Sequence, residues 1–272
     1  MMALDSTRCL RLGHATATLS SIKEKNAAFA AAENFFSLPS GDKEAWMAPF
    51  AEERGYRRSN AHTEVFIVRG EKVPAAILPV LPYWRQCQAL ASKCLVDIAA
   101  HLNLPSENFL SLTDFNSVAD KQLSPSCMRI LRYAGRDTRD DCQRALPMHV
   151  DVGLLSIIPR STNPALQVID MTDFSLRDAE ELLTDRQCLV IGGATLSYVT
   201  NNMFLSCHHA VKATKLPRLS VVYQLRPTGT AQLTSSSFTS KETGAFGRPF
   251  SRTAATFINE EKRLRSSVSL PH

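Results

Sequence analysis

The 272-residue chain lacks the features of membrane, secreted and disulfide-stabilised proteins. No apolar stretch approaches the roughly 18 residues that a membrane-spanning helix requires, and the first residues lack the apolar core of a secretory signal. The seven cysteines are scattered, odd in number and without a Cys-x-x-Cys pair, which indicates reduced thiols. We therefore expect a cytoplasmic protein with no membrane partner.

The chain also has no strong excess of charge of either sign. Its net charge is +5, and no block of basic residues alternates with aromatic ones, so a nucleic-acid partner is not indicated. Apolar residues make up 44% of the chain and charged residues 21%, which is typical of a globular protein. A chain of this length can bury a sizeable core, and we favour a monomer.

Helical patterns dominate the first part of the sequence. Residues 22–36 are rich in helix formers and end before Pro39. In residues 82–102 apolar side chains recur at a spacing of three and four, as on one face of a helix. Ser106 begins a further short helix. We therefore predict a mostly helical N-terminal region over residues 1–125 that packs on the core.

The middle of the sequence has a residue pattern typical of strands rather than helices. Short runs of β-forming residues, separated by Pro, Gly, Asn and Asp, occupy 128–133, 154–158, 166–169, 188–191, 204–207 and 220–225. Many short strands at this spacing are typical of a sandwich or barrel. We predict a β core over residues 126–228, followed by a tail over 229–272 that is a candidate lid and has a terminal helix near 258–264.

Two histidines and an aspartate form the most informative pattern. His149 and Asp151 stand in Met-His-Val-Asp-Val-Gly, and His209 follows in Ser-Cys-His-His-Ala-Val. Residues i and i+2 of a strand point to the same face, so His149 and Asp151 can reach one metal ion, and the second histidine must come from a nearby strand. Two imidazoles and one carboxylate are the ligands of non-haem Fe(II) sites with open coordination positions.

An arginine and a serine follow on a later predicted strand. Arg218 lies nine residues after His209, and Ser220 shares its strand face. An isolated arginine on a strand is usually solvated. A guanidinium and a hydroxyl on one face, however, are suited to binding a carboxylate. Together with the metal ligands, they indicate an oxygenase that binds a 2-oxo acid.

From about residue 129 to 227 these motifs resemble the Fe(II)- and 2-oxoglutarate-dependent oxygenases of the isopenicillin N synthase-like family. That family carries His-x-Asp followed by Gly, a distal His in Ser-x-x-His, and Arg-x-Ser on a later strand, and the chain has each of these. Ala-Leu-Gln-Val at 165–168, Thr-Asn-Asn at 200–202 and Phe-Phe-Ser-Leu-Pro at 35–39 are also similar. Two departures stand out: Ala210 replaces a common arginine, and Ala134 replaces the proline of Tyr-Tyr-Pro.

The resemblance implies a mainly β fold with flanking helices: a double-stranded β-helix, also called a jelly roll or cupin-like fold, that holds the metal at its mouth. It implies Fe(II) bound by His149, Asp151 and His209. Adjacent strand residues point to opposite faces, so only one of His208 and His209 can join the site. The family's Ser-x-x-His register selects His209.

The resemblance also implies a co-substrate site and a reaction. Arg218, Ser220 and Tyr133 would bind 2-oxoglutarate, although Tyr133 is equally compatible with a strand residue that packs its ring. The implied reaction oxidises a small organic metabolite with O2 by hydroxylation, desaturation or ring closure, and releases succinate and CO2. Ascorbate is a candidate reductant.

Alternatives remain at this stage. The same fold could serve an iron oxidase that does not use 2-oxoglutarate, with Arg218 and Ser220 holding the substrate's own carboxylate. It could also serve as a non-catalytic small-molecule receptor. A structural zinc site is less favoured, because zinc prefers four protein ligands and no fourth is evident. Substrate specificity is expected to come from residues 50–80 and the tail after 228, where Phe238, Phe246 and Phe250 could either line a pocket or pack in the core.

Overall fold

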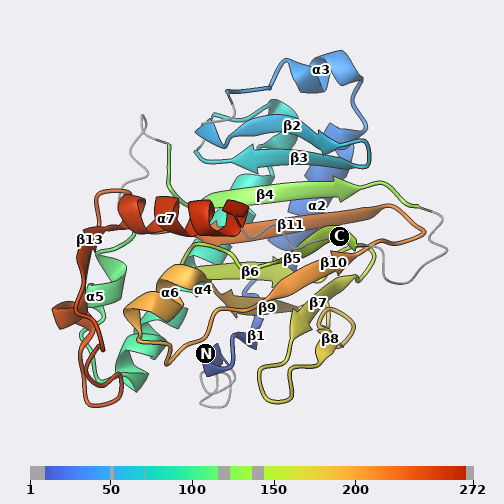
Figure 1. The fold of residues 1–272 in the computed structure, drawn as a ribbon. Helices are drawn as coiled ribbons and strands as arrows, with labels where there is room; N and C mark the ends of the chain where they lie inside the picture. The colour runs from blue at the N-terminus through green and yellow to red at the C-terminus, as the bar shows by residue number, and fades with distance from the viewer. Residues whose placement is uncertain (1–9, 50–51, 71, 116–122, 137–143, 268–272) are drawn as a thin grey trace.

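The structure is a computed structural model, and it describes residues 10–49, 52–70, 72–115, 123–136 and 144–267. Two antiparallel sheets lie at its centre (Figure 1). The long sheet has the order β1-β9-β6-β11-β4-β3-β2, and the short sheet has the order β5-β10-β7-β8. The long-sheet strands are β1 (His14–Thr18), β2 (Gly55–Asn60), β3 (Thr63–Val68), β4 (Cys127–Tyr133), β6 (Leu155–Pro159), β9 (Gln187–Gly192) and β11 (Arg218–Leu225). The short-sheet strands are β5 (Arg144–His149), β7 (Leu166–Ile169), β8 (Leu176–Asp178) and β10 (His209–Lys212).

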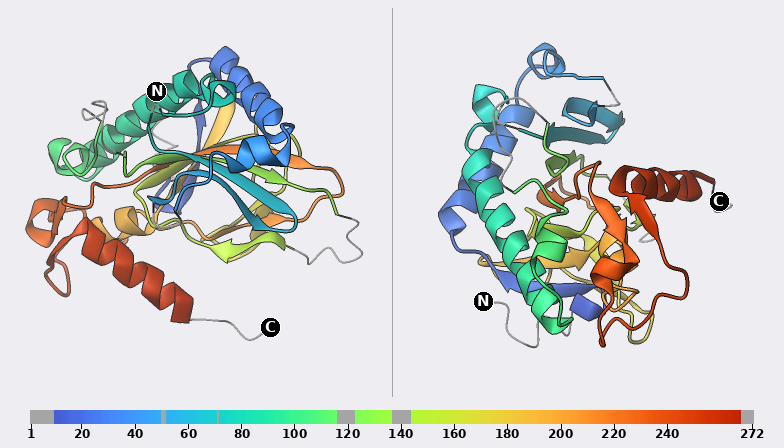
Figure 2. Two further views of the ribbon diagram at one scale, coloured as in Figure 1. Left: turned by 90° about the horizontal axis from the view of Figure 1, so that it is seen from above. Right: turned by 90° about the vertical axis from the view of Figure 1, so that its left-hand side faces the viewer.

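The remaining elements flank these sheets. The helices are α2 (Ile22–Phe36), α3 (Ser40–Glu44), α4 (Val80–His101), α5 (Glu107–Leu110), α6 (Ala194–Val199) and α7 (Ala254–Ser267), with short 3-10 turns at η2 (Ala75–Ile77) and η3 (Ser235–Phe238). Strands β12 (Gln232–Thr234) and β13 (Ser251–Thr253) form a small ribbon. Helices α2 and α4 lie on one side of the long sheet, and α7 lies on the other (Figures 1 and 2). No helix within the described ranges is both long and apolar enough to cross a bilayer.

Strand β11 shows why the two faces of the long sheet differ. It pairs with β4 on one side and β6 on the other, so its side chains alternate between two buried environments. Leu219, Val221 and Tyr223 belong to the main hydrophobic core. Arg218 and Ser220 point the other way, into a cavity between the sheets. Period-two alternation in one strand therefore separates the core from the candidate site.

Helix α2 shows how the outer layer is attached. The Ser21 hydroxyl caps its first turn by accepting from the Glu24 amide at 3.3 Å. Its inner face carries small buried residues, Ala28, Ala31 and Ala32, which pack in the core that the long sheet shares with α4. Small side chains allow close helix packing, and the helix spans the predicted residues 22–36.

The predicted fold class is confirmed, and most of the predicted helices and strands are present. The N-terminal region contains α2, α3, α4 and α5, and it also supplies β1, β2 and β3, which belong to the long sheet and complete both of its edges. One detail of the prediction was wrong. Residues 204–207 do not form a strand; the paired strand is β10, a few residues later. It lies between β5 and β7, and this pairing fixes where the strand begins.

The described cysteines are all buried and form no disulfide; they are at positions 87, 94, 127, 188 and 207. This agrees with the prediction of reduced thiols, although Cys9 and Cys142 lie outside the described residues. Burial raises the pKa of Cys207 to about 12, so this thiol stays protonated at neutral pH. It belongs to the smaller hydrophobic cluster between the sheets, which favours the interpretation of a packed core thiol.

Candidate metal centre and co-substrate pocket

The structure brings His149, Asp151 and His209 together. His149 is the last residue of β5 and His209 the first of β10, and the two are direct partners across the sheet. Their ring centroids lie 4.2 Å apart. One ligand atom from each of the three residues lies within 4.8 Å of the others, a separation that permits a shared metal ion. As predicted, the second imidazole comes from a neighbouring strand.

Asp151 differs in one detail from its predicted position. Strand β5 ends at His149, so the aspartate lies in the loop that follows rather than within a paired strand. Two side-chain donors fix its carboxylate: Ser156 Oγ donates to one oxygen, and Gln224 Nε2 donates to the other at 2.8 Å. Side chains on β6 and β11 therefore orient the carboxylate, and its direction does not depend on the geometry of β5.

The start of α6 holds this loop in place. The amide of Ala194 donates to the carbonyl of Asp151 at 2.8 Å, and the amide of Thr195 donates to the carbonyl of Gly153 at 3.1 Å. A β-carbon on Gly193 would overlap the carbonyl oxygen of Gly153, so only glycine permits this close approach. The glycine after the His-x-Asp motif has the same constraint, because a β-carbon there would overlap the carbonyl oxygen of Leu225.

Both imidazoles are oriented through their Nδ1 atoms. Nδ1 of His149 lies 2.9 Å from the carbonyl oxygen of Pro147, and Nδ1 of His209 lies 3.1 Å from that of Cys207. A ring that donates from Nδ1 to a carbonyl presents an unprotonated Nε2, which is the form that binds a metal. The backbone of each strand therefore selects the metal-binding tautomer.

The ionisation of the cluster also suits a cation. Burial lowers the pKa of His149, and the neighbouring His209 lowers it further, so this ring is neutral at pH 7. Burial alone would raise the pKa of Asp151, but the two histidines and the Ser156 hydroxyl outweigh it and hold the pKa below its ordinary value. A neutral imidazole and an ionised carboxylate belong to the donor set that Fe(II) sites use.

A cavity of about 350 Å³ opens in front of the three residues. All six residues singled out from the sequence line it: His149, Asp151, His209, Arg218, Ser220 and Tyr133. His208 is exposed, whereas His209 is buried. Phe238 is buried in the main core, and Phe246 and Phe250 pack against it, so these phenylalanines do not line the cavity.

Arg218 has a partner that the sequence did not reveal. Its side chain is 2% exposed, and its Nη2 atom lies 3.2 Å from both carboxylate oxygens of Glu180, which is also buried. The amides of Ala165 and Leu166 donate to the same carboxylate at 2.8 and 2.9 Å. Burial would raise the pKa of Glu180, but Arg218 and these amides lower it below its ordinary value. The ion pair holds the guanidinium at the wall of the cavity.

The arginine still has capacity to bind a ligand. Its Nε atom is buried and has no hydrogen-bond partner among the described residues. Tyr133 is the cross-strand partner of Arg218, and its ring centroid lies 5.2 Å from the guanidinium carbon. Burial raises the pKa of Tyr133, so the phenol keeps its proton. An unsatisfied buried donor beside the hydroxyls of Tyr133 and Ser220 fits a ligand carboxylate.

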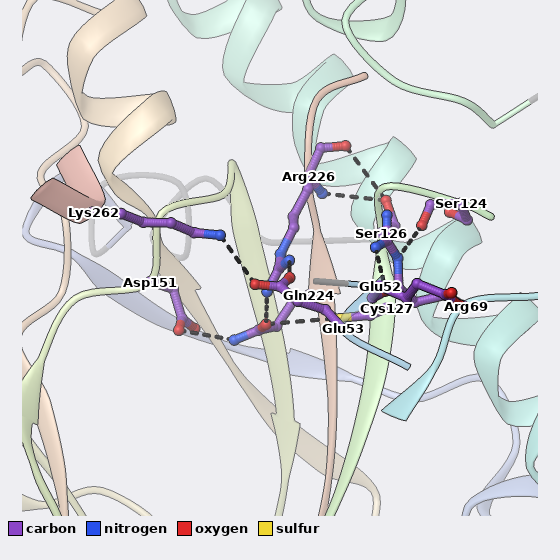
Figure 3. Close-up of polar contacts among 10 residues, drawn as sticks. All are labelled: Glu52, Glu53, Arg69, Ser124, Ser126, Cys127, Asp151, Gln224, Arg226 and Lys262. Atoms are coloured by element: carbon purple, nitrogen blue, oxygen red, sulfur yellow. Dashed lines mark hydrogen bonds and ion pairs between the residues drawn. The ribbon is translucent and has the colours of Figure 1, made fainter. Parts of the chain in front are cut away.

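A polar network joins the candidate metal ligand Asp151 to the C-terminal helix (Figure 3). Gln224, which donates to Asp151, accepts from Arg226 Nη2 at 2.9 Å. Arg226 Nη1 lies 2.6 Å from one oxygen of Glu53, and Lys262 Nζ from α7 lies 3.0 Å from the other. Burial would raise the pKa of Glu53, but the two cations lower it to about 2. Residues from the regions expected to determine specificity thus contribute to the cavity.

Of the site residues that the sequence analysis missed, one could have been predicted from the strand pattern and two could not. Gln224 shares the strand face of Arg218 and Ser220, so the same alternation could have assigned it to the cavity. Glu180 and Glu53 lie outside the named strands and belong to no motif. Nothing in the local sequence distinguishes them from solvated carboxylates.

The fold is shared with solved structures of 2-oxoglutarate-Fe(II) oxygenases. The sequence itself matches no protein-family model and no curated protein. T7H from Neurospora crassa, in complex with alpha-KG and thymine, superimposes with a TM-score of 0.77 and 17% identity, over 96% of this chain and 91% of that chain.

Two plant enzymes give similar results. The dioxygenase for auxin oxidation 1 from Arabidopsis thaliana, in complex with 2-oxoglutarate, has a TM-score of 0.72 and 16% identity, over 89% of this chain and 94% of that chain. The rice dioxygenase for auxin oxidation has a TM-score of 0.72 and 19% identity, over 97% of this chain and 90% of that chain. At these identities the likeness establishes the fold, while the chemistry has to be argued from the site.

Proposed function

We propose that the chain is an Fe(II)- and 2-oxoglutarate-dependent oxygenase that oxidises a small organic molecule with O2 and releases succinate and CO2. The convergence of His149, Asp151 and His209 at one cavity carries the proposal, because their ligand atoms lie within 4.8 Å of one another. Three protein ligands leave positions open on an octahedral ion, as a site that must also bind co-substrate and O2 requires. When bound, Fe(II) supplies the O2 chemistry that oxidises the substrate.

The protein residues have separate tasks in this proposal. His149 and His209 present Nε2, because their Nδ1 atoms are occupied by backbone carbonyls. Asp151 stays ionised and supplies the negative charge that partly neutralises the metal. Ser156 and Gln224 fix the direction of its carboxylate and do not themselves bind the metal.

The co-substrate is assigned to the opposite wall of the cavity. Arg218 offers its unpartnered Nε to the far carboxylate of 2-oxoglutarate, and Ser220 and Tyr133 offer hydroxyls. Glu180 keeps the guanidinium in place before the ligand arrives. The structures of T7H with alpha-KG and of the Arabidopsis enzyme with 2-oxoglutarate support this assignment through the shared fold.

The adjacent histidines provide a matched test of metal binding. We expect His209→Ala to lose one bound Fe(II) after anaerobic reconstitution, whereas His208→Ala retains it, because only His209 is buried beside the other ligands. Iron content and Mn(II) titration calorimetry measure this directly. Equal metal binding by both variants would contradict the assigned triad.

Co-substrate use is tested by turnover. We expect O2 uptake and succinate formation in the wild-type protein to depend on added 2-oxoglutarate, and we expect Arg218→Met to raise the KM for 2-oxoglutarate. Oxygen uptake without 2-oxoglutarate would support the iron oxidase that does not use it. Metal binding without any turnover, across a broad metabolite screen, would support a receptor instead.

A further inference from the structure

Arg129 is a cation in the cavity that the proposed metal and co-substrate sites do not use. It lies on β4, where alternate residues Arg129, Leu131 and Tyr133 line the cavity while Met128 and Ile130 belong to the main core. The side chain is half-buried. Strand alternation therefore directs this guanidinium into the space between the sheets rather than into solvent.

No hydrogen bond or salt bridge joins Arg129 to another described residue, in contrast to the other cations that line the cavity. Arg218 is paired with Glu180, and Arg226 and Lys262 are paired with Glu53. A partly desolvated guanidinium without an anion is costly, because its five donors are poorly satisfied. Such a group is stabilised when a ligand brings a negative charge.

Arg129 is well separated from the proposed clamp for the far carboxylate of the co-substrate. Its cross-strand partner on β11 is Val222, whereas the partner of Arg218 is Tyr133. Four residues along a strand correspond to about 13 Å. Arg129 lies instead on the metal side of the cavity, because its partner Val222 is two residues from Gln224, which donates to Asp151.

Two further positively charged residues line the same cavity as Arg129. Arg226 and Lys262 both pair with the carboxylate of Glu53. Both cations line the cavity together with Arg129. A positive field that converges on a partly closed cavity favours the entry of anions.

On these grounds we propose that the substrate carries a carboxylate or another small anionic group, and that Arg129 binds it beside the metal. The inference rests on the proposed function and narrows its substrate class. Arg129 would be a specificity-determining residue, because a neutral analogue of the same shape would leave the guanidinium without a partner. The anion would hold the rest of the substrate in the cavity near Val222, the cross-strand partner of Arg129.

Matched acids and amides provide the test. Mn(II)-loaded protein with saturating 2-oxoglutarate is titrated with phenylacetate, benzoate and indole-3-acetate and with the amide of each, and binding is followed by thermal shift and calorimetry. The variants are Arg129→Gln and, as a control on the same strand, Arg132→Gln, whose side chain is 44% exposed and pairs with Glu64. We expect acids to bind the wild type and the control more tightly than their amides. In Arg129→Gln the acids should weaken by about 10- to 100-fold while the amides change little.

Several results would overturn the inference. Amides that bind as tightly as acids, no acid in the panel that binds, or acid binding unchanged in Arg129→Gln would each do so. A selective loss of 2-oxoglutarate affinity in Arg129→Gln would assign the residue to the co-substrate instead. Failure of the proposed function is recognised separately, because the wild-type protein would then show no thermal shift with Mn(II) and 2-oxoglutarate before any acid is added.

Discussion

Replacing Glu180 by glutamine tests the buried ion pair that holds Arg218. The amide has the shape of the carboxylate but no charge, so the guanidinium would be left in a site where both side chains are almost fully buried. An uncompensated buried charge costs about 3–5 kcal/mol. Oε2 accepts from the Ser161 hydroxyl and the amides of Ala165 and Leu166, so the NH2 group is expected in place of Oε1. The Ser161 amide, which donates to Oε1, would then lose its acceptor, at a cost of about 1–3 kcal/mol. We expect a total loss of about 4–8 kcal/mol.

The reciprocal change should cost less. Arg218→Met removes the cation, but the carboxylate of Glu180 keeps the amides of Ser161, Ala165 and Leu166 and the Ser161 hydroxyl as donors. With four donors retained, we expect a loss of about 3 kcal/mol, at the lower end of the range for a broken buried pair. Comparing the two losses of unfolding free energy therefore shows which partner of the ion pair is also stabilised by hydrogen bonds from the surrounding residues.

Urea unfolding at pH 7, followed by circular dichroism, gives the free energy of unfolding of each variant from its midpoint and slope. Arg132→Met serves as the control, because its partly exposed pair with Glu64 should contribute less than about 1 kcal/mol. A Glu180→Gln variant within about 1 kcal/mol of the wild type, or an Arg218→Met variant that is the less stable of the two, would refute the reasoning.

Two further predictions concern the loop and the network around the site. Gly193→Ala should cost about 3 kcal/mol or more and weaken metal binding, because its β-carbon would overlap the carbonyl of Gly153; urea unfolding and Mn(II) titration measure both effects. Glu53→Gln should flatten the acid limb of the stability profile. The carboxylate, with a folded pKa of about 2, contributes stability above its unfolded pKa of about 4.5, and this contribution is lost as the pH falls toward 2. If thermal melting of wild type and variant changes in parallel between pH 6 and 3, the pairing of Glu53 with Arg226 and Lys262 is not stabilising.

The local parts of the fold could be predicted from the sequence, because their signals lie within a few neighbouring residues. Residues 22–36 carry a cap and a run of alanines, and the helix has the predicted bounds. The alternation in residues 218–225 located β11 and two of the cavity residues. The candidate metal triad was predicted because its motifs have fixed spacing and order, although only strand pairing brings His209 beside His149.

The missed parts depend on contacts between distant segments. The strand at residues 55–60, Gly-Tyr-Arg-Arg-Ser-Asn, has almost no apolar alternation, and it is a strand because β3 pairs with it. Residues 204–207 have strand-forming side chains but no partner, since β10 begins only at His209. Glu180 and Glu53 could be recognised only in the structure, because their partners Arg218 and Arg226 are distant in the sequence.

The long sheet pairs strands that are far apart in the sequence, and this has a consequence for biosynthesis. Strand β1 lies beside β9, and the Cys188 thiol donates to the carbonyl of Ala17, 171 residues earlier. During synthesis β1 must therefore wait until β9 has been made before it can pair with this neighbour. A recombinant fragment cut to residues 126–228 would expose the backbone edges of β9 and β4 to other molecules. Expression of residues 126–228 in isolation should therefore give aggregates, whereas in the intact chain β1 pairs with β9 and β3 pairs with β4.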